Sequence, residues 1–299
     1  MSAASVPPAP PPRAPLIREV NRLLILQNLG LNAFLTLGFL WAATQGHPSL
    51  VDALLVLVAF VGARNAGHAF NQIVDRDLDA RNPRTRDRPL VTGSLSVRFA
   101  GALVAGNLVV VLVAAWLLNP LVLLLAPLAL ALVLGYSYTK RYTPFTTVIL
   151  GSVEAMVPAG VYLAIVEGLP PAAWAGIGGV LLFGTAFESV HSLQDLDADR
   201  ESGIHSLPRS LGERRTVPLV AGLLAASLVF LLLFGTLASL GLPFDLALLA
   251  MAAVAAWEIR GLSTRSVPLR TLFRAHFAMG LAFLLGVWAS YIPGVHLVP

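Results

Sequence analysis

Three polar residues spaced four apart are the first candidates for chemistry in this sequence. On a helix, Asn71, Asp75 and Asp79 fall on nearly one face, because one turn takes 3.6 residues. They lie at the end of an apolar run, where carboxylates oppose the helix dipole unless a cation is present. We therefore expect positive charge at this position, and an arginine-rich segment follows at residues 81–88.

The two aspartates recur 120 residues later as Asp195 and Asp199, again at the end of an apolar run. Four apolar runs lie between the first pair of aspartates and the second, which is typical of a duplicated four-helix unit. The duplication predicts that the two acidic helices face each other across an axis of pseudo-symmetry.

Further polar residues extend both faces back into the apolar runs. Arg64 and His68 extend the first face, and Glu188 and His191 extend the second. Placing such a stripe of polar side chains inside a bilayer costs free energy, so it predicts a functional site. A structural ion-pair network between helices is the alternative.

The acidic positions offer only oxygen ligands, which favour Mg²⁺ or Ca²⁺ over zinc. Five basic residues accompany them: Arg84, Arg88, Lys140, Arg141 and Arg200. Carboxylates and cationic side chains belong together where a metal bridges them to a polyanion, and a diphosphate fits that description. Taken alone, Lys140 and Arg141 also fit ordinary anchors at the membrane interface.

Composition identifies the class of protein. Of 299 residues, 57% are hydrophobic and 12% are charged, and the mean hydropathy is +0.77. Soluble domains carry about 25% charged residues, so we predict an all-α polytopic membrane protein. Nine apolar runs are about long enough to cross roughly 30 Å of hydrocarbon. They lie near residues 22–42, 50–74, 97–118, 121–139, 145–166, 172–194, 216–240, 243–258 and 272–292.

The basic residues predict the orientation of these spans. If the nine spans alternate, all 20 Lys and Arg residues except Arg64 fall on one side of the membrane. The positive-inside rule places the N-terminus and the polar loops in the cytoplasm and the C-terminus outside the cell membrane. Residues 1–20 predict a disordered cytoplasmic tail, and residues 21–294 a single transmembrane domain. Attraction to lipid headgroups explains the basic loop at 260–274, so we expect no nucleic-acid partner.

Four motifs occur in a fixed order along the chain. They are Asn71-x3-Asp75-x3-Asp79, Arg84-Thr-x-x-Arg88-Pro-Leu-x2-Gly93, Tyr136-x3-Lys140-Arg141-x-Thr143 and Gln194-Asp195-x3-Asp199-x3-Gly203-x2-Ser206. In this order they resemble the UbiA superfamily of intramembrane prenyltransferases, over roughly residues 20–290. The resemblance implies nine helices around a central cavity. It also implies Mg²⁺-dependent transfer of a polyprenyl group from a polyprenyl diphosphate to an aromatic acceptor.

The resemblance implies roles for individual residues as well. The Mg²⁺ ligands would be Asn71, Asp75, Asp79, Asp195 and Asp199, with the four aspartates as the catalytic residues. The diphosphate would be bound by Asn71, Arg84, Arg88, Lys140 and Arg141. For Lys140 and Arg141, this replaces the role of interface anchors.

The acceptor is less clearly defined by the sequence. The string from Gln194 to Pro208 is similar to a branch of the family described as 4-hydroxybenzoate polyprenyltransferases, which act in ubiquinone synthesis. That branch also contains enzymes of futalosine-type menaquinone synthesis, whose acceptor is a dihydroxynaphthoate, and both acceptors stay open. Many hydroxybenzoate enzymes have Asp, Tyr and Lys where this chain has Glu188, His191 and His205.

Both acceptors are aromatic acids with a carboxylate. Arg64, about 16 Å deeper in the membrane than Asp75, is a candidate anchor for that carboxylate. His68, Glu188 or His191 could take the ring proton after the ring attacks the allylic cation, and a phosphate oxygen is the alternative. A cavity shielded from water would protect the cation.

A cation- or proton-coupled transporter is the rival from another class, with the acidic stripe as an ion relay. Transporter sites usually lie near the bilayer midplane, between interrupted helices. Here the aspartates cluster at predicted cytoplasmic helix ends beside arginine-rich loops, which favours the enzyme. A transporter would show cation flux without release of diphosphate.

Overall fold

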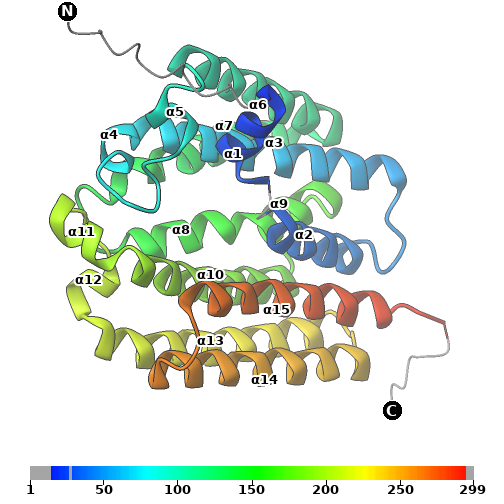
Figure 1. Cartoon of the computed structure of the whole chain (residues 1–299). Helices are drawn as coiled ribbons and strands as arrows, with labels where there is room; N and C mark the ends of the chain where they lie inside the picture. The colour runs from blue at the N-terminus through cyan, green and yellow to red at the C-terminus, as the bar shows by residue number, and fades with distance from the viewer. Residues whose placement is uncertain (1–14, 27–28, 294–299) are drawn as a thin grey trace, which may run out of the picture.

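The structure is a computed structural model and describes residues 15–26 and 29–293, the side chains of Arg270 and Phe273 excepted. The regular secondary structure of these residues is helical (Figure 1). The helices are α1 (Leu16–Leu24), α2 (Leu29–Ala43), α3 (Leu50–Val74), α4 (Arg76–Asp79), α5 (Pro89–Thr92), α6 (Val97–Leu118), α7 (Pro120–Thr139), α8 (Thr146–Glu154), α9 (Met156–Ile165), α10 (Pro171–Gln194), α11 (Leu196–Ser202), α12 (Leu207–Leu211), α13 (Glu213–Leu237), α14 (Leu242–Thr264) and α15 (Leu269–Ala289).

The predicted all-α polytopic membrane architecture is confirmed. Within the described residues, seven helical stretches are long and apolar enough to span a membrane, with α8 and α9 counted as one stretch. A bent pair, α1 and α2 at 60° to each other, raises the number to eight. The ninth predicted span corresponds to α15, whose apolar part, Arg274–Ala289, is a shorter helix.

The N-terminal prediction meets the structure only at its end. Residues 1–14 of the predicted tail lie outside the described residues. The chain is helical from Leu16 onward, so the predicted boundary of the tail at residue 20 falls inside α1. This helix carries Leu23 and Leu24 on a buried side, where they pack near α3.

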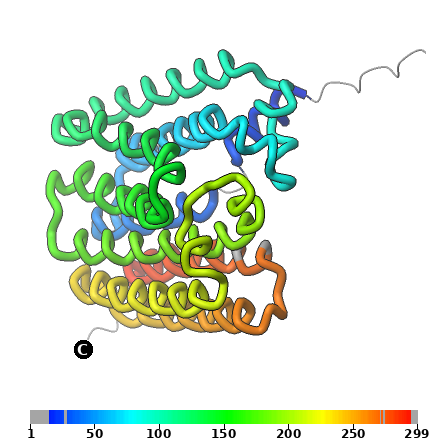
Figure 2. Tube along the Cα trace, turned by 90° about the vertical axis from the view of Figure 1, so that its left-hand side faces the viewer, coloured from blue at the N-terminus to red at the C-terminus, as the bar shows by residue number. Residues whose placement is uncertain are grey.

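The two predicted repeats follow the same course at one end of the bundle. A long helix ends at Asp75 in the first repeat and at Asp195 in the second. Both aspartates have φ near −100° and ψ near zero, −92° and 1° for Asp75 and −105° and 6° for Asp195. Two short helices and another long helix then follow in each repeat, so α3–α6 corresponds to α10–α13. Figure 2 looks onto this end of the bundle, where the short helices lie.

The two repeats are packed differently. In the most apolar stretch of α10, 67% of the residues are buried, against 28% in α3. Glycines allow this close packing: a Cβ on Gly178 would lie 2.6 Å from the ring of Phe230 on α13. On the other side, a cavity of about 720 Å³ separates α3 from α10 and is lined by residues of both. The two acidic helices therefore face each other across a cavity.

Candidate functional site

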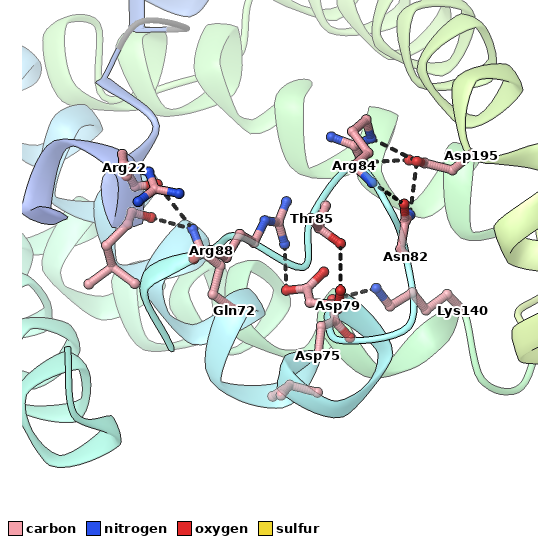
Figure 3. Close-up of polar contacts among 12 residues, drawn as sticks. Arg22, Gln72, Asp75, Asp79, Asn82, Arg84, Thr85, Arg88, Lys140 and Asp195 are labelled. Atoms are coloured by element: carbon pink, nitrogen blue, oxygen red, sulfur yellow. Dashed lines mark hydrogen bonds and ion pairs between the residues drawn. The ribbon is translucent and has the colours of Figure 1, made fainter. Parts of the chain in front are cut away.

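The acidic ends of α3 and α4 are surrounded by basic side chains of the first repeat (Figure 3). The buried Asp75 is paired with Lys140 and lies 3.9 Å from the Arg141 guanidinium. Asp79 accepts a 2.7 Å hydrogen bond from Arg88 Nη1. Asn71 lies one turn before Asp75, whose N–H donates to the Asn71 carbonyl over 2.8 Å. The structure therefore brings these predicted residues together, with the helix broken at Asp75.

Asp195 receives its partners from the other repeat. Arg84 donates to it twice, from Nε over 2.7 Å and from Nη2 over 2.5 Å. Asn82 adds a third hydrogen bond over 3.0 Å. The loop between α4 and α5 therefore fastens the first repeat to the acidic end of α10.

Asp199 has the weakest set of partners of the four aspartates. The hydroxyl of Ser206 donates to it over 3.4 Å, and Lys140 and Arg209 act on it only through their charge. The lysine lies between the repeats, since it is paired with Asp75 and its backbone carbonyl accepts the N–H of His205 over 2.8 Å. Lys140 thus connects the loop between α11 and α12 to the end of α3.

The acid strengths of the two second-repeat aspartates diverge. Burial alone would raise the pKa of the Asp195 carboxyl, but Arg84 and Asn82 hold it below its usual value. Burial, and then the charge of Asp195, raise the pKa of Asp199 to about 6. Burial also raises the pKa of Asp75, against the attraction of Lys140. Two adjacent carboxyls therefore differ in charge in mildly acidic solution.

The donor set fits Mg²⁺ held jointly with a phosphate ligand. Within the described residues, no three Asp, Glu or His side chains converge into a metal-binding group. Mg²⁺ at phosphate sites usually takes one or two carboxylates and completes its shell with waters and phosphate oxygens. The aspartates supply such oxygens from two helix ends, and Asp75 Oδ1 is buried without a hydrogen bond among those residues. The site therefore suits a metal that arrives with its anion.

The deeper predicted residues line the cavity: Arg64, His68, Glu188 and His191. His191 Nδ1 lies 3.5 Å from the Glu188 carboxylate on the next turn of α10. Arg64 donates over 2.9 Å to each of the carbonyls of Leu24 and Ile25, at the break between α1 and α2. A structural role of Arg64 is thus visible, which the sequence did not predict. Arg64 also lines the cavity, and these two hydrogen bonds use two of its five N–H donors.

Two polar residues of the site were missed by sequence reasoning. Asn82 bonds to Asp195, and its own side-chain oxygen accepts the N–H of Arg84 over 2.9 Å. Asn82 precedes a proline, a common turn signal that could have marked it. Arg22 of α1 lines the cavity and donates to the Asp87 carbonyl. Nothing in its spacing distinguishes Arg22 from an interface anchor.

Comparison with known proteins agrees with this geometry. A model of the UbiA prenyltransferase family matches residues 32–278. The chain belongs to this family. It is similar to 4-hydroxybenzoate octaprenyltransferase of Pseudomonas fluorescens (strain SBW25), at 33% identity over 260 residues, or 86% of each chain.

Solved structures of UbiA homologues share the fold. The apo structure of a homologue from Aeropyrum pernix K1 superposes with a TM-score of 0.78 at 30% identity, over 86% of this chain and 96% of that one. A homologue from Archaeoglobus fulgidus, bound to GPP and Mg²⁺, gives a TM-score of 0.72 at 19% identity, over 91% and 99%. The family predicted from the four motifs is confirmed.

Proposed function

We propose that this UbiA family member transfers a polyprenyl group from an allylic polyprenyl diphosphate to 4-hydroxybenzoate, as in ubiquinone synthesis. One observation carries the proposal: aspartates of both repeats pair with basic side chains of the first repeat beside a largely apolar cavity, and two of these basic residues, Arg84 and Arg88, line that cavity. A diphosphate suits the polar end, and a prenyl chain suits the apolar remainder. The name of the similar Pseudomonas protein supports the choice of acceptor.

The polar end would hold the diphosphate with Mg²⁺. Asp75, Asp79, Asp195 and Asp199, with the amide oxygen of Asn71, are its proposed ligands. When bound, Mg²⁺ supplies charge neutralisation for the departing diphosphate. The protein's own cations stabilise the same charge, and these are Arg84, Arg88, Lys140 and Arg141. Since each of them lies on an aspartate or its neighbouring backbone, a diphosphate needs only short side-chain movements to reach them.

The deeper part of the cavity would hold the acceptor. Arg64 is the proposed partner of the acceptor carboxylate, and His68, Glu188 and His191 surround the ring. These side chains exclude bulk water from the allylic cation, which would otherwise be captured by hydrolysis. The ring can then attack the cation as the nearest nucleophile.

The proposal includes nine crossings, with α1 and α2 as the first and α15 as the last. The basic loops and the N-terminus face the cytoplasm, and the C-terminus lies outside. The chain has no cysteine, so single cysteines test this orientation. We expect His47→Cys and Glu201→Cys, both at exposed positions, to react with an impermeant thiol reagent from opposite sides of the membrane. Labelling from the same side would overturn the orientation.

The activity can be tested with the full-length protein in membranes. We expect prenylated product from Mg²⁺, octaprenyl diphosphate and 4-hydroxybenzoate, and none after chelation of divalent cations. A parallel reaction with 1,4-dihydroxy-2-naphthoate tests the acceptor. Product from the naphthoate alone would overturn the 4-hydroxybenzoate assignment and leave the reaction type intact. If neither aromatic acid gives a product, or if cations cross the membrane without release of diphosphate, the proposed reaction type is wrong.

A further inference from the structure

One acid in the cavity has no partner in the site described so far. Glu154 is the last residue of α8, directly before the break to α9, and its side chain lines the cavity. This side chain makes no hydrogen bond or ion pair with another residue in the described part of the chain. Its electrostatic interactions are with Glu188, another acid, and with Tyr136. Because an unpaired acid in an apolar site is costly, this position calls for a ligand.

A glycine on α10 makes room for this carboxyl. A Cβ added to Gly184 would lie 2.2 Å from Glu154 Oε2, far inside any real contact. In the helix register, Gly184 precedes Asp195 by eleven residues, as Arg64 precedes Asp75. Gly184 is therefore the repeat counterpart of Arg64, and the carboxyl of Glu154 fills the space where a counterpart side chain would begin.

This register fixes the depth of the two groups. Eleven residues of helix correspond to about 16 Å of rise, so Arg64 and Gly184 lie at similar depths below the two acidic helix ends. Arg64 extends from α3 and the Glu154 carboxyl rests against α10, on the opposite wall of the same cavity. The cavity thus presents a cation on one wall and an unpaired carboxyl on the other.

We infer that Glu154 accepts a hydrogen bond from the phenolic hydroxyl of the aromatic acid whose carboxylate pairs with Arg64. A para-hydroxy acid carries its two polar groups at opposite ends of a flat ring, which matches the two walls. Glu188 is the other acid of the cavity, about one turn nearer to Asp195, and His191 Nδ1 lies 3.5 Å from its carboxylate. The inference rests on the proposed function, because it concerns the acceptor of that reaction.

The bond gives Glu154 a part in the chemistry. The C1–O bond of the prenyl diphosphate breaks, its electron pair leaves with the diphosphate, and the ring carbon beside the hydroxyl then bonds to C1 of the allylic cation. The phenolic proton passes to the Glu154 carboxylate, which leaves a neutral dienone. The ring proton is then lost to a diphosphate oxygen, and Glu154 returns its proton to the phenolic oxygen. The aromatic ring is restored, and Glu154 is unchanged.

The first test separates binding from turnover. Glu154→Gln keeps an oxygen that accepts a hydrogen bond but cannot take the proton, so we expect KM for 4-hydroxybenzoate within threefold and kcat reduced about 100-fold. Glu154→Ala loses both functions, so its KM should rise about tenfold as well. If Glu154→Gln and Glu154→Ala show the same change in KM and the same change in kcat, the role of Glu154 is structural and the inference is wrong.

The second test isolates the hydroxyl group. Binding of 4-hydroxybenzoate and of benzoate is measured by calorimetry without prenyl diphosphate, so that no turnover occurs. We expect the hydroxyl to improve affinity about tenfold in the unmodified protein and less than twofold in Glu154→Ala. Benzoate itself should bind both proteins equally, since its carboxylate still meets Arg64. An unchanged benefit of the hydroxyl in Glu154→Ala would assign the contact to another residue.

The third test moves the carboxyl without removing it. Gly184→Ala forces Glu154 away from α10, and the added carbon would also lie 3.2 Å from Gly151 Cα. It should lower kcat/KM about tenfold, and Glu154→Asp in the same chain should recover the part that comes from the carboxyl. Gly106→Ala, where the added carbon meets nothing within 4 Å, is the matched control and should be neutral. Absence of recovery, with a folded protein, would contradict the positioning role. If the unmodified protein makes no product from 4-hydroxybenzoate, the proposed function fails instead.

Discussion

The two acidic helix ends follow the same backbone course but differ in how their second aspartate is paired. In the first repeat, Arg88 stands just before Pro89 and bonds to Asp79 over 2.7 Å. In the second repeat the order is reversed: Arg209 follows Pro208 and donates to the backbone carbonyl of Ile204. The arginine of the second repeat is thus displaced by one residue relative to the repeat offset, and its guanidinium bonds to a backbone carbonyl instead of to the carboxylate of the second aspartate.

This shift makes the repeats unequal in charge. The first repeat provides the basic partners of its own aspartates and, through Arg84, of Asp195 as well. The second repeat contributes carboxylates, of which Asp199 has no ion pair among the described residues. The first repeat is thus the main source of cations for the aspartates of both. Three experiments test this division.

Removal of one aspartate charge from each helix should have the largest effect. We expect Asp75→Asn and Asp195→Asn each to reduce kcat about 10³-fold, because the diphosphate leaves only when its charge is stabilised. The matched controls are Asp77→Asn and Asp197→Asn, each two residues further along the chain and exposed on the short helix that follows, α4 or α11. They should stay within twofold. Rates of diphosphate release at saturating Mg²⁺ provide the measurement, and equal losses at Asp75 and Asp77 would refute the assignment of the acidic face.

The elements that carry this site could be predicted almost completely from the sequence. Hydropathy and length are properties of local sequence, and the apolar runs at 50–74 and 97–118 match α3 and α6 to the residue. The run at 243–258 was too short, because α14 continues to Thr264 through polar residues. Tertiary contacts support such a helix end, and hydropathy does not register them.

The pairing of side chains was less predictable. The acidic and basic residues of the site were found from their spacing, but not that Arg84 would reach across to Asp195, which depends on a turn at Asn82. The sequence also did not predict a buried pair between α14 and α15, where His276 Nδ1 lies 3.4 Å from Glu258 Oε1. Long-range pairs have no period in the sequence. Only the packing of the helices brings them together.

Loss of the bridge between the repeats should have an intermediate effect. Arg84→Ala removes two charge-assisted hydrogen bonds to Asp195 and a cation proposed to bind the diphosphate. We expect KM for the prenyl diphosphate to rise about 10- to 100-fold, with a smaller change in kcat. Arg84→Lys should recover only part, since an ammonium cannot bond to both oxygens in parallel. Arg86→Ala, at an exposed position of the same loop, is the control, and a similar rise in that variant would indicate only a general electrostatic effect.

The smallest effect concerns the unpaired aspartate of the second repeat. The Asp199 carboxyl, with its pKa raised to about 6 from 3.8, keeps its proton in the folded protein at pH values where the unfolded chain has released it. Between these two pKa values the folded state binds more protons than the unfolded state, so the contribution of this group to the free energy of unfolding falls as the pH rises from the lower value to the higher. Asp199→Asn removes the effect, and the ligand-free variant should therefore gain a few degrees in Tm relative to the unmodified protein between about pH 4 and about pH 6.5. Asp197→Asn, whose side chain is 92% exposed, should show a constant difference. A constant difference for Asp199→Asn as well would mean that Asp199 is charged throughout this pH range. The position of Arg209 would then leave the charge of Asp199 as well stabilised as Arg88 leaves that of Asp79.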